Sequence, residues 1–171
     1  MSRAWSIAWA LAALVIVIAM TASASLAARQ SEPSSAHSTV PAAGADSWRF
    51  ASVDVYVDPA GETLVAWQAR ISDSSGRIKV VGIEGGEDPS FSSTPTYDPA
   101  VLALSTLGTS PHDVLRLAAI DVSGAGPSSK TRVARVHVAV LGDAPLSLAL
   151  DLETAASSGG PITSARAHLI P

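Results

Sequence analysis

The chain has 171 residues, no cysteine and a formal charge of −4 at pH 7. Because cysteine is absent, disulfides, thiolate catalysis and cysteine-ligated zinc are excluded. The acidic excess repels phosphate backbones and no basic stripe interleaved with aromatic residues is present, so nucleic-acid binding is not expected.

Residues 1–28 have the pattern of a targeting segment. Arg3 supplies a positive charge, an uncharged and mostly apolar run follows from residue 7 to residue 28, and Ala22-Ser23-Ala24 matches a signal-peptidase site. We expect cleavage after this site and export of the rest of the chain. The alternative is a retained membrane anchor over residues 7–28, since an uncharged run of this length can span a bilayer.

Arg29–Asp46 is rich in Ser, Ala and Pro and has no apolar period. Such a segment cannot bury enough apolar surface to offset the entropy lost on ordering. A flexible spacer is therefore predicted here, followed by one domain over residues 47–171.

The first strand of that domain is predicted over residues 48–58. Val53, Val55 and Val57 alternate there with Asp54, Tyr56 and Asp58. Successive side chains of a strand point to opposite faces, so this period of two indicates one buried face.

Residues 62–86 are predicted to form the centre of the core, as two strands joined by a polar turn. In the first strand, Leu64–Ile71, the side chains alternate between two faces. The inward set is Val65, Trp67, Ala69 and Ile71, and the outward set is Leu64, Ala66, Gln68 and Arg70. On the pattern alone, residues 62–86 read as a buried hairpin or strand pair.

The remaining segments continue the β pattern. Residues 87–99 form a long irregular stretch that Phe91 and Tyr97 are expected to pack against the domain. Residues 98–104 fit either a short helix that begins at Asp98 or a short strand. Further strands are predicted at residues 114–122, 131–141, 146–152 and 162–170. Seven or more short strands without a long helix predict an all-β, two-sheet sandwich.

The residue types used in catalysis are present, but not in a recognisable pattern. No Gly-x-Ser-x-Gly motif occurs, and His37, His112, His137 and His168 are scattered without metal-ligand spacing. Aromatic residues outside the targeting segment are too few to line a sugar-cleaving cleft. We therefore expect no enzyme activity and no cofactor.

Acidic residues gather at the ends of predicted strands. One group is Asp54, Asp58 and Glu62, and the other is Glu84, Glu87 and Asp88. Carboxylate oxygens can bind calcium, which stays open as an alternative. Solvated turns explain both groups more simply, because their spacing matches no EF-hand loop.

Several motifs follow one another in order between about residue 50 and residue 170. They are V-V-G-I-E-G-G at 80–86, Asp88-Pro89-Ser90-Phe91, Tyr97–Leu102, Leu115–Gly124 and Arg132–Val140. Their order and spacing resemble the cohesin family, the receptor modules of bacterial surface scaffolds. The resemblance implies a jelly-roll sandwich, a fold that cohesins share with some carbohydrate-binding modules. Ser72-Asp73-Ser74-Ser75 stands where cohesins usually have an aromatic-Asp-Pro corner.

The resemblance also implies a function. Cohesins bind dockerin partners across one sheet face, through the strand that corresponds to Leu64–Ile71, and this places Ala66, Gln68 and Arg70 at partner-binding positions. Cohesins that bind dockerin strongly have Asn and Asp where this chain has Ala66 and Gln68, so the partner is either dockerin-like or a different protein. The expected function is protein binding or assembly, in a secreted or envelope-attached module.

A carbohydrate-binding module on the same fold is the alternative function. Binding of a polysaccharide needs exposed aromatic rings aligned on one face, and the candidates are Trp48, Tyr56 and Tyr97.

Overall fold

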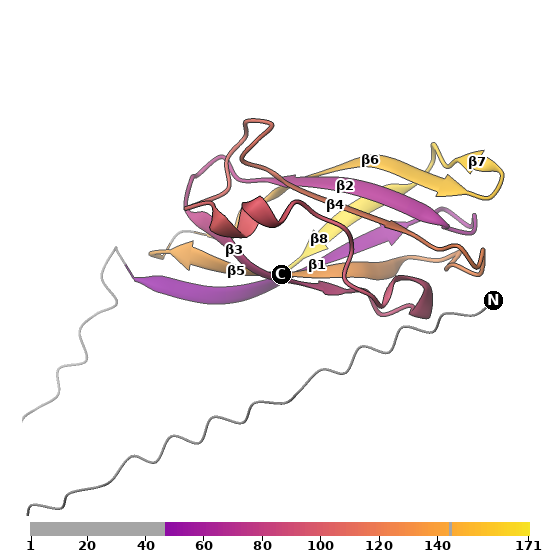
Figure 1. Cartoon of the computed structure of the whole chain (residues 1–171), viewed down its shortest axis with the longest axis horizontal. Helices are drawn as coiled ribbons and strands as arrows, with labels where there is room; N and C mark the ends of the chain where they lie inside the picture. Colours follow the sequence, from indigo (N-terminus) through magenta and orange to yellow (C-terminus); the bar gives the residue numbers. More distant parts are fainter. Residues whose placement is uncertain (1–46, 144) are drawn as a thin grey trace, which may run out of the picture. The chain divides into compact units, whose positions relative to one another are not determined.

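The computed structural model describes residues 47–143 and 145–171, so the predicted signal segment or anchor and the predicted spacer lie outside the described residues. Within them, two four-stranded antiparallel sheets face each other across one core, as in a β-sandwich (Figure 1). This confirms the all-β, two-sheet prediction. No helix in the described ranges is long and apolar enough to cross a membrane.

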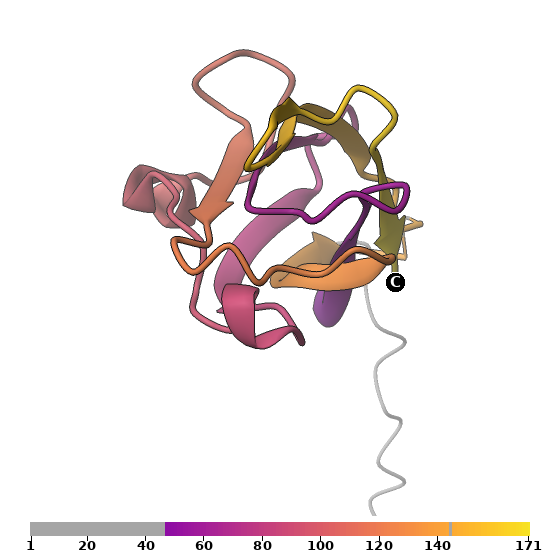
Figure 2. The ribbon, with the colours of Figure 1, turned by 90° about the vertical axis from the view of Figure 1, so that its right-hand side faces the viewer.

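The β1 sheet has the strand order β3-β5-β1-β8, and the β2 sheet has the order β4-β2-β6-β7. The strands of the β1 sheet are β1 (Trp48–Asp58), β3 (Ile78–Gly85), β5 (Thr131–Leu141) and β8 (Arg166–Ile170). Those of the β2 sheet are β2 (Ala66–Ser72), β4 (Leu115–Ile120), β6 (Ala149–Ser157) and β7 (Gly160–Pro161). Two 3₁₀ helices, η1 (Pro89–Phe91) and η2 (Pro99–Ala103), lie in the β3–β4 connection, which runs along one side of the sheets in Figure 2.

The core is formed by the inward face of each central strand. Val53, Val55 and Val57 of β1 are buried, and so are Trp67 and Ile71 of β2. Both sets are those that the period of two predicts. Complete burial of each such side chain stabilises the fold by about 1.5–3 kcal/mol, which makes the two inward faces the main source of stability.

The hairpin prediction for residues 62–86 is wrong, because β2 and β3 belong to different sheets. β2 pairs with β4 and β6, whereas β3 pairs with β5. The turn between them carries the chain across the core from one sheet to the other. The alternation of apolar and polar residues indicates only that each strand buries one face. Two strands in opposite sheets of a sandwich bury one face each, just as the two strands of a hairpin do, so the pattern cannot distinguish the two arrangements.

Leu64 was predicted to point outward, and the structure contradicts this because Leu64 is fully buried. β2 begins only at Ala66, so Leu64 lies in the preceding connection, where its N–H donates to the carbonyl of Pro127 at 2.9 Å. The alternation of a strand does not apply to a residue outside the strand.

The last two predicted strands begin later than expected. β6 starts at Ala149, and Leu146 and Leu148 pack against the core ahead of it. The stretch after Pro161 turns before β8 begins, with the N–H of Ala165 donating to the carbonyl of Ile162 at 3.3 Å. Both apolar stretches bury side chains from irregular backbone, which an alternation test cannot distinguish from a strand.

The long β3–β4 connection packs as predicted, with Phe91 buried and Tyr97 against the core. The ambiguous segment is helical: the Asp98 side chain accepts from the N–H of Ala100 at 2.9 Å and caps η2. Gly85 permits the fold-back after β3, since a Cβ there would lie 2.1 Å from the carbonyl oxygen of Ser92.

Two loops share one local structure. Asp73–Arg77 and Asp121–Ala125 both follow the pattern Asp-x-Ser-Gly-x, with the Gly at positive φ. In each loop the carboxylate accepts from the N–H and hydroxyl of the Ser and from the N–H two residues beyond it. They differ in burial, because Asp73 is 1% exposed whereas Asp121 is partly exposed.

Candidate partner-binding face

The three residues predicted to bind a partner all lie on β2 and point away from the core. Ala66, Gln68 and Arg70 alternate with buried residues, and β2 lies between β4 and β6 in its sheet. The pairing register defines the residues around them, and we call the whole set the β2 face. Its members are Ala66, Gln68 and Arg70 of β2, Arg116, Ala118 and Ile120 of β4, and Asp151, Glu153, Thr154 and Ala156 of β6.

A polar network covers one part of the β2 face, with Glu153 at its centre. Gln68 Nε2 donates to Glu153 Oε2 at 2.6 Å, and Arg116 Nε lies 3.5 Å from Glu153 Oε1. Arg70 Nη2 donates to Asp151 Oδ2 at 3.1 Å, and its Nε is 3.9 Å from Glu153 Oε1. Exposed ion pairs of this kind contribute only about 0–1 kcal/mol to folding. Their main effect is to hold polar groups in place on the surface.

A bulge in β6 positions Glu153. Gln68 pairs with Thr154 and Ala69 pairs with Leu152, so Glu153 is an extra residue opposite β2. Bulges redirect a side chain locally. This one lets a single carboxylate reach Gln68 as well as the two arginines.

The other part of the β2 face is apolar, and most of its side chains are small. Ile120 pairs with Ala66 and is 71% exposed, and its neighbours on the face, Ala118 and Ala156, are small. Thr96 bridges to Ala118 through two backbone hydrogen bonds, so this edge of β4 is partly covered. An exposed aliphatic side chain beside a fixed polar network matches the apolar centre and polar rim of protein interfaces.

The shortest ion pair among the described residues lies on the opposite side of the sandwich, on the outer face of the β1 sheet. Arg135 Nε and Nη2 donate to the two carboxylate oxygens of Asp54 at 2.6 and 2.9 Å, and Arg132 Nη1 lies 3.5 Å from Asp54 Oδ1. The Arg135 hydrogen bonds and charge, helped by Arg132, lower the pKa of Asp54 below its ordinary value of 3.8, although partial burial opposes the shift. The cluster therefore stabilises the fold as long as Asp54 is ionised.

Replacing Asp54 with Asn is expected to make stability less sensitive to acid. A carboxyl whose pKa is lower in the folded than in the unfolded chain adds stability above the unfolded value, and this contribution is lost as the pH falls through the folded value. The difference in unfolding free energy between wild type and Asp54→Asn should thus be largest near neutral pH and shrink below pH 3.8. Denaturant titrations at stepped pH measure it. A difference that stays constant across that range would contradict the assignment.

Ser52, His137 and Glu84 form a hydrogen-bonded row across β1, β5 and β3. Ser52 Oγ is 3.0 Å from His137 Nδ1, and His137 Nε2 is 2.9 Å from Glu84 Oε1. The residue types are those of a hydrolytic triad, but a triad also needs a substrate pocket and oxyanion donors. In the described part of the chain, the pockets beside η2 and around β6, β7 and β8 are lined by other residues. The absence of enzyme activity stays a prediction.

The two acidic groups considered for calcium are distributed over separate contacts. Asp58 and Asp88 accept from the N–H groups of Ala60 and Ser90 in their own turns, both at 2.9 Å. Glu87 accepts from the N–H of Arg132 at 3.0 Å. In the described ranges no group of three or more His, Asp or Glu side chains is placed to hold a metal ion. Calcium binding stays an untested alternative.

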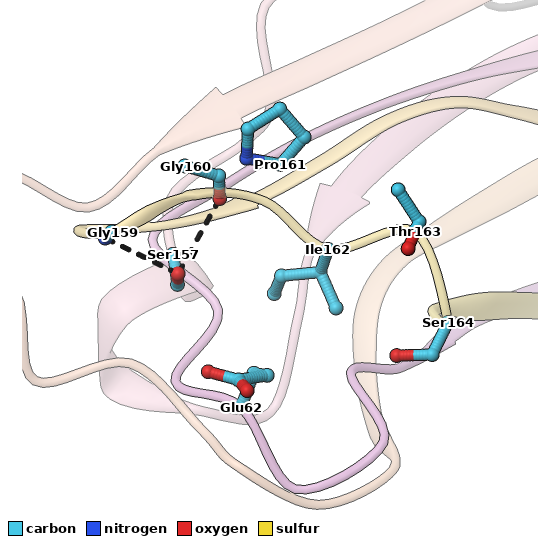
Figure 3. Close-up of a pocket in the computed structure, with 8 residues that line it drawn as sticks. All are labelled: Glu62, Ser157, Gly159, Gly160, Pro161, Ile162, Thr163 and Ser164. Carbon is cyan, nitrogen blue, oxygen red and sulfur yellow. Dashed lines mark hydrogen bonds between the residues drawn. The ribbon is translucent and has the colours of Figure 1, made fainter.

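A pocket of about 350 Å³ lies beside the β6–β7 turn (Figure 3). Ser157 Oγ accepts from the N–H of Gly159 at 3.3 Å and donates to the carbonyl of Gly160 at 3.4 Å. Both hydrogen bonds of the hydroxyl therefore lie within the β6–β7 turn. Glu62 is the one charged side chain in the lining. A single carboxylate without a partner acid or base does not form a glycosidase pair.

The aromatic residues considered for polysaccharide binding do not form a platform. Trp48 and Tyr56 share the outer face of β1, but they are eight residues apart, roughly 27 Å at the rise of a strand. Tyr56 lies under Lys130, whose Nζ is 5.2 Å from the ring centre. Tyr97 packs against the core. The exposed aromatic pair is instead Trp48 and Phe50, which are 44% and 77% exposed.

Comparison with known proteins finds no matching family model, no matching curated protein and no matching solved structure. The resemblance to cohesins therefore stays a prediction from the sequence.

Proposed function

We propose that this chain is an exported, non-enzymatic module that binds a protein partner through the β2 face, on a jelly-roll sandwich of the cohesin type. The observation that carries the proposal is the exposed Ile120 beside the fixed network of Arg70, Glu153 and Arg116 on adjacent strands. Ala66, Gln68 and Arg70, the positions that the resemblance to cohesins implies, lie together on this face.

A protein surface suits the β2 face better than a sugar does. The face carries no aromatic side chain among its members, whereas sugar recognition relies on stacked rings. The planar guanidinium of Arg70 can donate several hydrogen bonds to a partner. Because Asp151 already holds this side chain in position, little side-chain entropy remains to be lost on binding. Ala66 and Ala118 are small, which lets a partner's backbone approach between Ile120 and the network.

Replacing Arg70 with Glu is expected to weaken partner binding by at least ~2 kcal/mol. The substitution removes the guanidinium and places a third carboxylate beside Asp151 and Glu153. The partner is first isolated from the secreted proteins of the same organism with the exported chain as bait, and each variant is then titrated by calorimetry.

The matched control is Lys79→Glu, which reverses a charge on the opposite sheet. Arg166 is less suitable, because its Nη1 donates to the carbonyls of Ser164 and Ala165 and its loss would disturb that turn. Equal affinities of the Arg70 and Lys79 variants would remove the β2 face from consideration. A bait that retains only polysaccharide would favour the carbohydrate-binding alternative.

Export gives a second, separate prediction. The mature protein is expected to start at or near Ser25, because Ala22-Ser23-Ala24 follows the apolar run. N-terminal sequencing of the protein outside the cytoplasm measures this. A sequence that begins at Met1 or Ser2 would contradict cleavage and favour the retained anchor, without affecting the proposal for the β2 face.

A further inference from the structure

The outer edge of β1 is only half covered. β8 pairs with β1 from Asp54 to Asp58, whereas β5 pairs with the other edge from Trp48 to Val57. In residues 47–143 and 145–171, no strand pairs with this outer edge between Trp48 and Val53. Figure 1 shows β1 extending past the end of β8.

The backbone groups of three residues point to this open edge. The N–H of Gly142 donates to the carbonyl of Ser47 at 2.8 Å, and Trp48 pairs with Leu141, so the odd-numbered residues at the start of β1 bond to β5. Backbone direction alternates along an antiparallel strand. Trp48, Phe50 and Ser52 therefore present their N–H and carbonyl groups to the open side. An extended strand is the structure that satisfies such groups.

We propose that the open edge binds a second copy of this chain, through antiparallel pairing of β1 with β1. Antiparallel pairing with a copy sets the stretch from Trp48 to Ser52 against its own sequence in reverse, so the side chains that become opposed must fit each other. With Phe50 at the centre, Phe50 lies opposite Phe50 of the copy, and Trp48 lies opposite Ser52. Each large indole then faces a small side chain, and three pairs exchange about six backbone hydrogen bonds.

Three features of the edge favour this occupant and this register. Trp48, Phe50 and Ser52 carry no charge, so two copies of a chain with a net charge of −4 meet here without repulsion between opposed side chains. The exposed Phe50 rings of the two copies become directly opposed, and Trp48 of each copy lies on the diagonal to the Phe50 of the other, an arrangement that stabilises sheets. A shift of the register toward Asp54 would bring Trp48 opposite Asp54, a place that Ile170 of β8 already occupies, so the pairing cannot extend in that direction.

Sedimentation of the exported protein over a range of concentrations tests the proposal. The wild type is expected to associate reversibly into a dimer. Phe50→Glu and Phe50→Pro are each expected to raise the dimer dissociation constant at least ~10-fold, by charge repulsion and by loss of the N–H that points to the edge. Because that N–H is not part of the β5 ladder, the proline variant should keep the wild-type circular dichroism. Val122→Glu, at a loop position that is 93% exposed, is the control and should dimerise as the wild type does.

Hydrogen exchange measured by NMR locates the contact. Protection of the amides of Trp48, Phe50 and Ser52 should rise with protein concentration, while the amides of Arg49 and Ala51, bonded to β5, should be protected throughout. A protein that stays monomeric at millimolar concentration would overturn the proposal, and so would Phe50 variants that dimerise like the wild type. If the monomer instead loses a protein ligand on Phe50→Glu, the edge binds an extended segment of that ligand and self-association is wrong.

Discussion

Replacing Trp67 with alanine is expected to lower the free energy of unfolding by about 3–5 kcal/mol. Trp67 is 1% exposed and is the largest fully buried side chain of the domain. Its strand is held between β4 and β6, so the backbone cannot move inward to fill the space that the indole leaves. Chemical denaturation followed by circular dichroism measures the loss.

Two further tryptophan variants make this test specific. Trp48→Ala, at 44% exposure, removes the same side chain from the surface and is expected to have little effect on stability in dilute protein. Trp67→Phe should cost clearly less than Trp67→Ala, because it keeps a buried ring and removes an indole N–H that has no hydrogen-bond partner. An unfolding midpoint that Trp67→Ala leaves unchanged would mean that the side chain lies outside the core, as a one-residue slip of β2 would place it.

Replacing Asp73 with alanine is expected to cost about 2–4 kcal/mol. The buried carboxylate accepts hydrogen bonds from the N–H groups of Ser75, Arg77 and Ile78 at 2.8–3.1 Å, and from the Ser75 hydroxyl. Alanine leaves the buried N–H of Ile78 without this acceptor and removes the bonds that hold the turn where the chain crosses between the sheets, although the N–H of Arg77 also reaches Ser75 Oγ at 3.2 Å. In the sequence Asp73 is only one residue of a polar turn, and its burial, at 1% exposure, is what makes the expected cost large.

Asp121→Ala is the matched control for Asp73→Ala. Asp121 holds a loop of the same pattern, but its carboxylate is partly exposed, so water can replace the lost hydrogen bonds. Its stability loss should be clearly smaller in the same denaturation experiment. Equal losses for the two variants would show that the local loop structure, rather than burial, determines the cost.

The sequence was enough to predict which face of each strand is buried, but not which strands pair with one another. Trp67 and Ile71 point inward because alternation is a local property of a few consecutive side chains. The pairing of β2 with β4 and β6 depends instead on segments far along the chain. Gln68 and Glu153, which share a hydrogen bond, are 85 residues apart.

The same limit applies to the candidate face. Ala66, Gln68 and Arg70 were found by alternation together with the resemblance to cohesins. Glu153 was not predicted, because its place in the network depends on a bulge in β6 that no local sequence pattern indicates. The row of Ser52, His137 and Glu84 was missed for a related reason. His137 stood alone in the sequence and Glu84 was grouped with its neighbours Glu87 and Asp88, and only the pairing of three strands places them beside Ser52.

A protein partner that docks on the β2 face should change the amide chemical shifts of that face. The ¹⁵N-labelled protein is titrated with the partner isolated with this chain as bait, and amide shifts are followed residue by residue. The largest changes are expected at Gln68, Arg70, Ile120 and Glu153, with the outer face of the β1 sheet unchanged. Changes confined to the β1 sheet, with the amides of the β2 face unmoved at saturation, would contradict the claim.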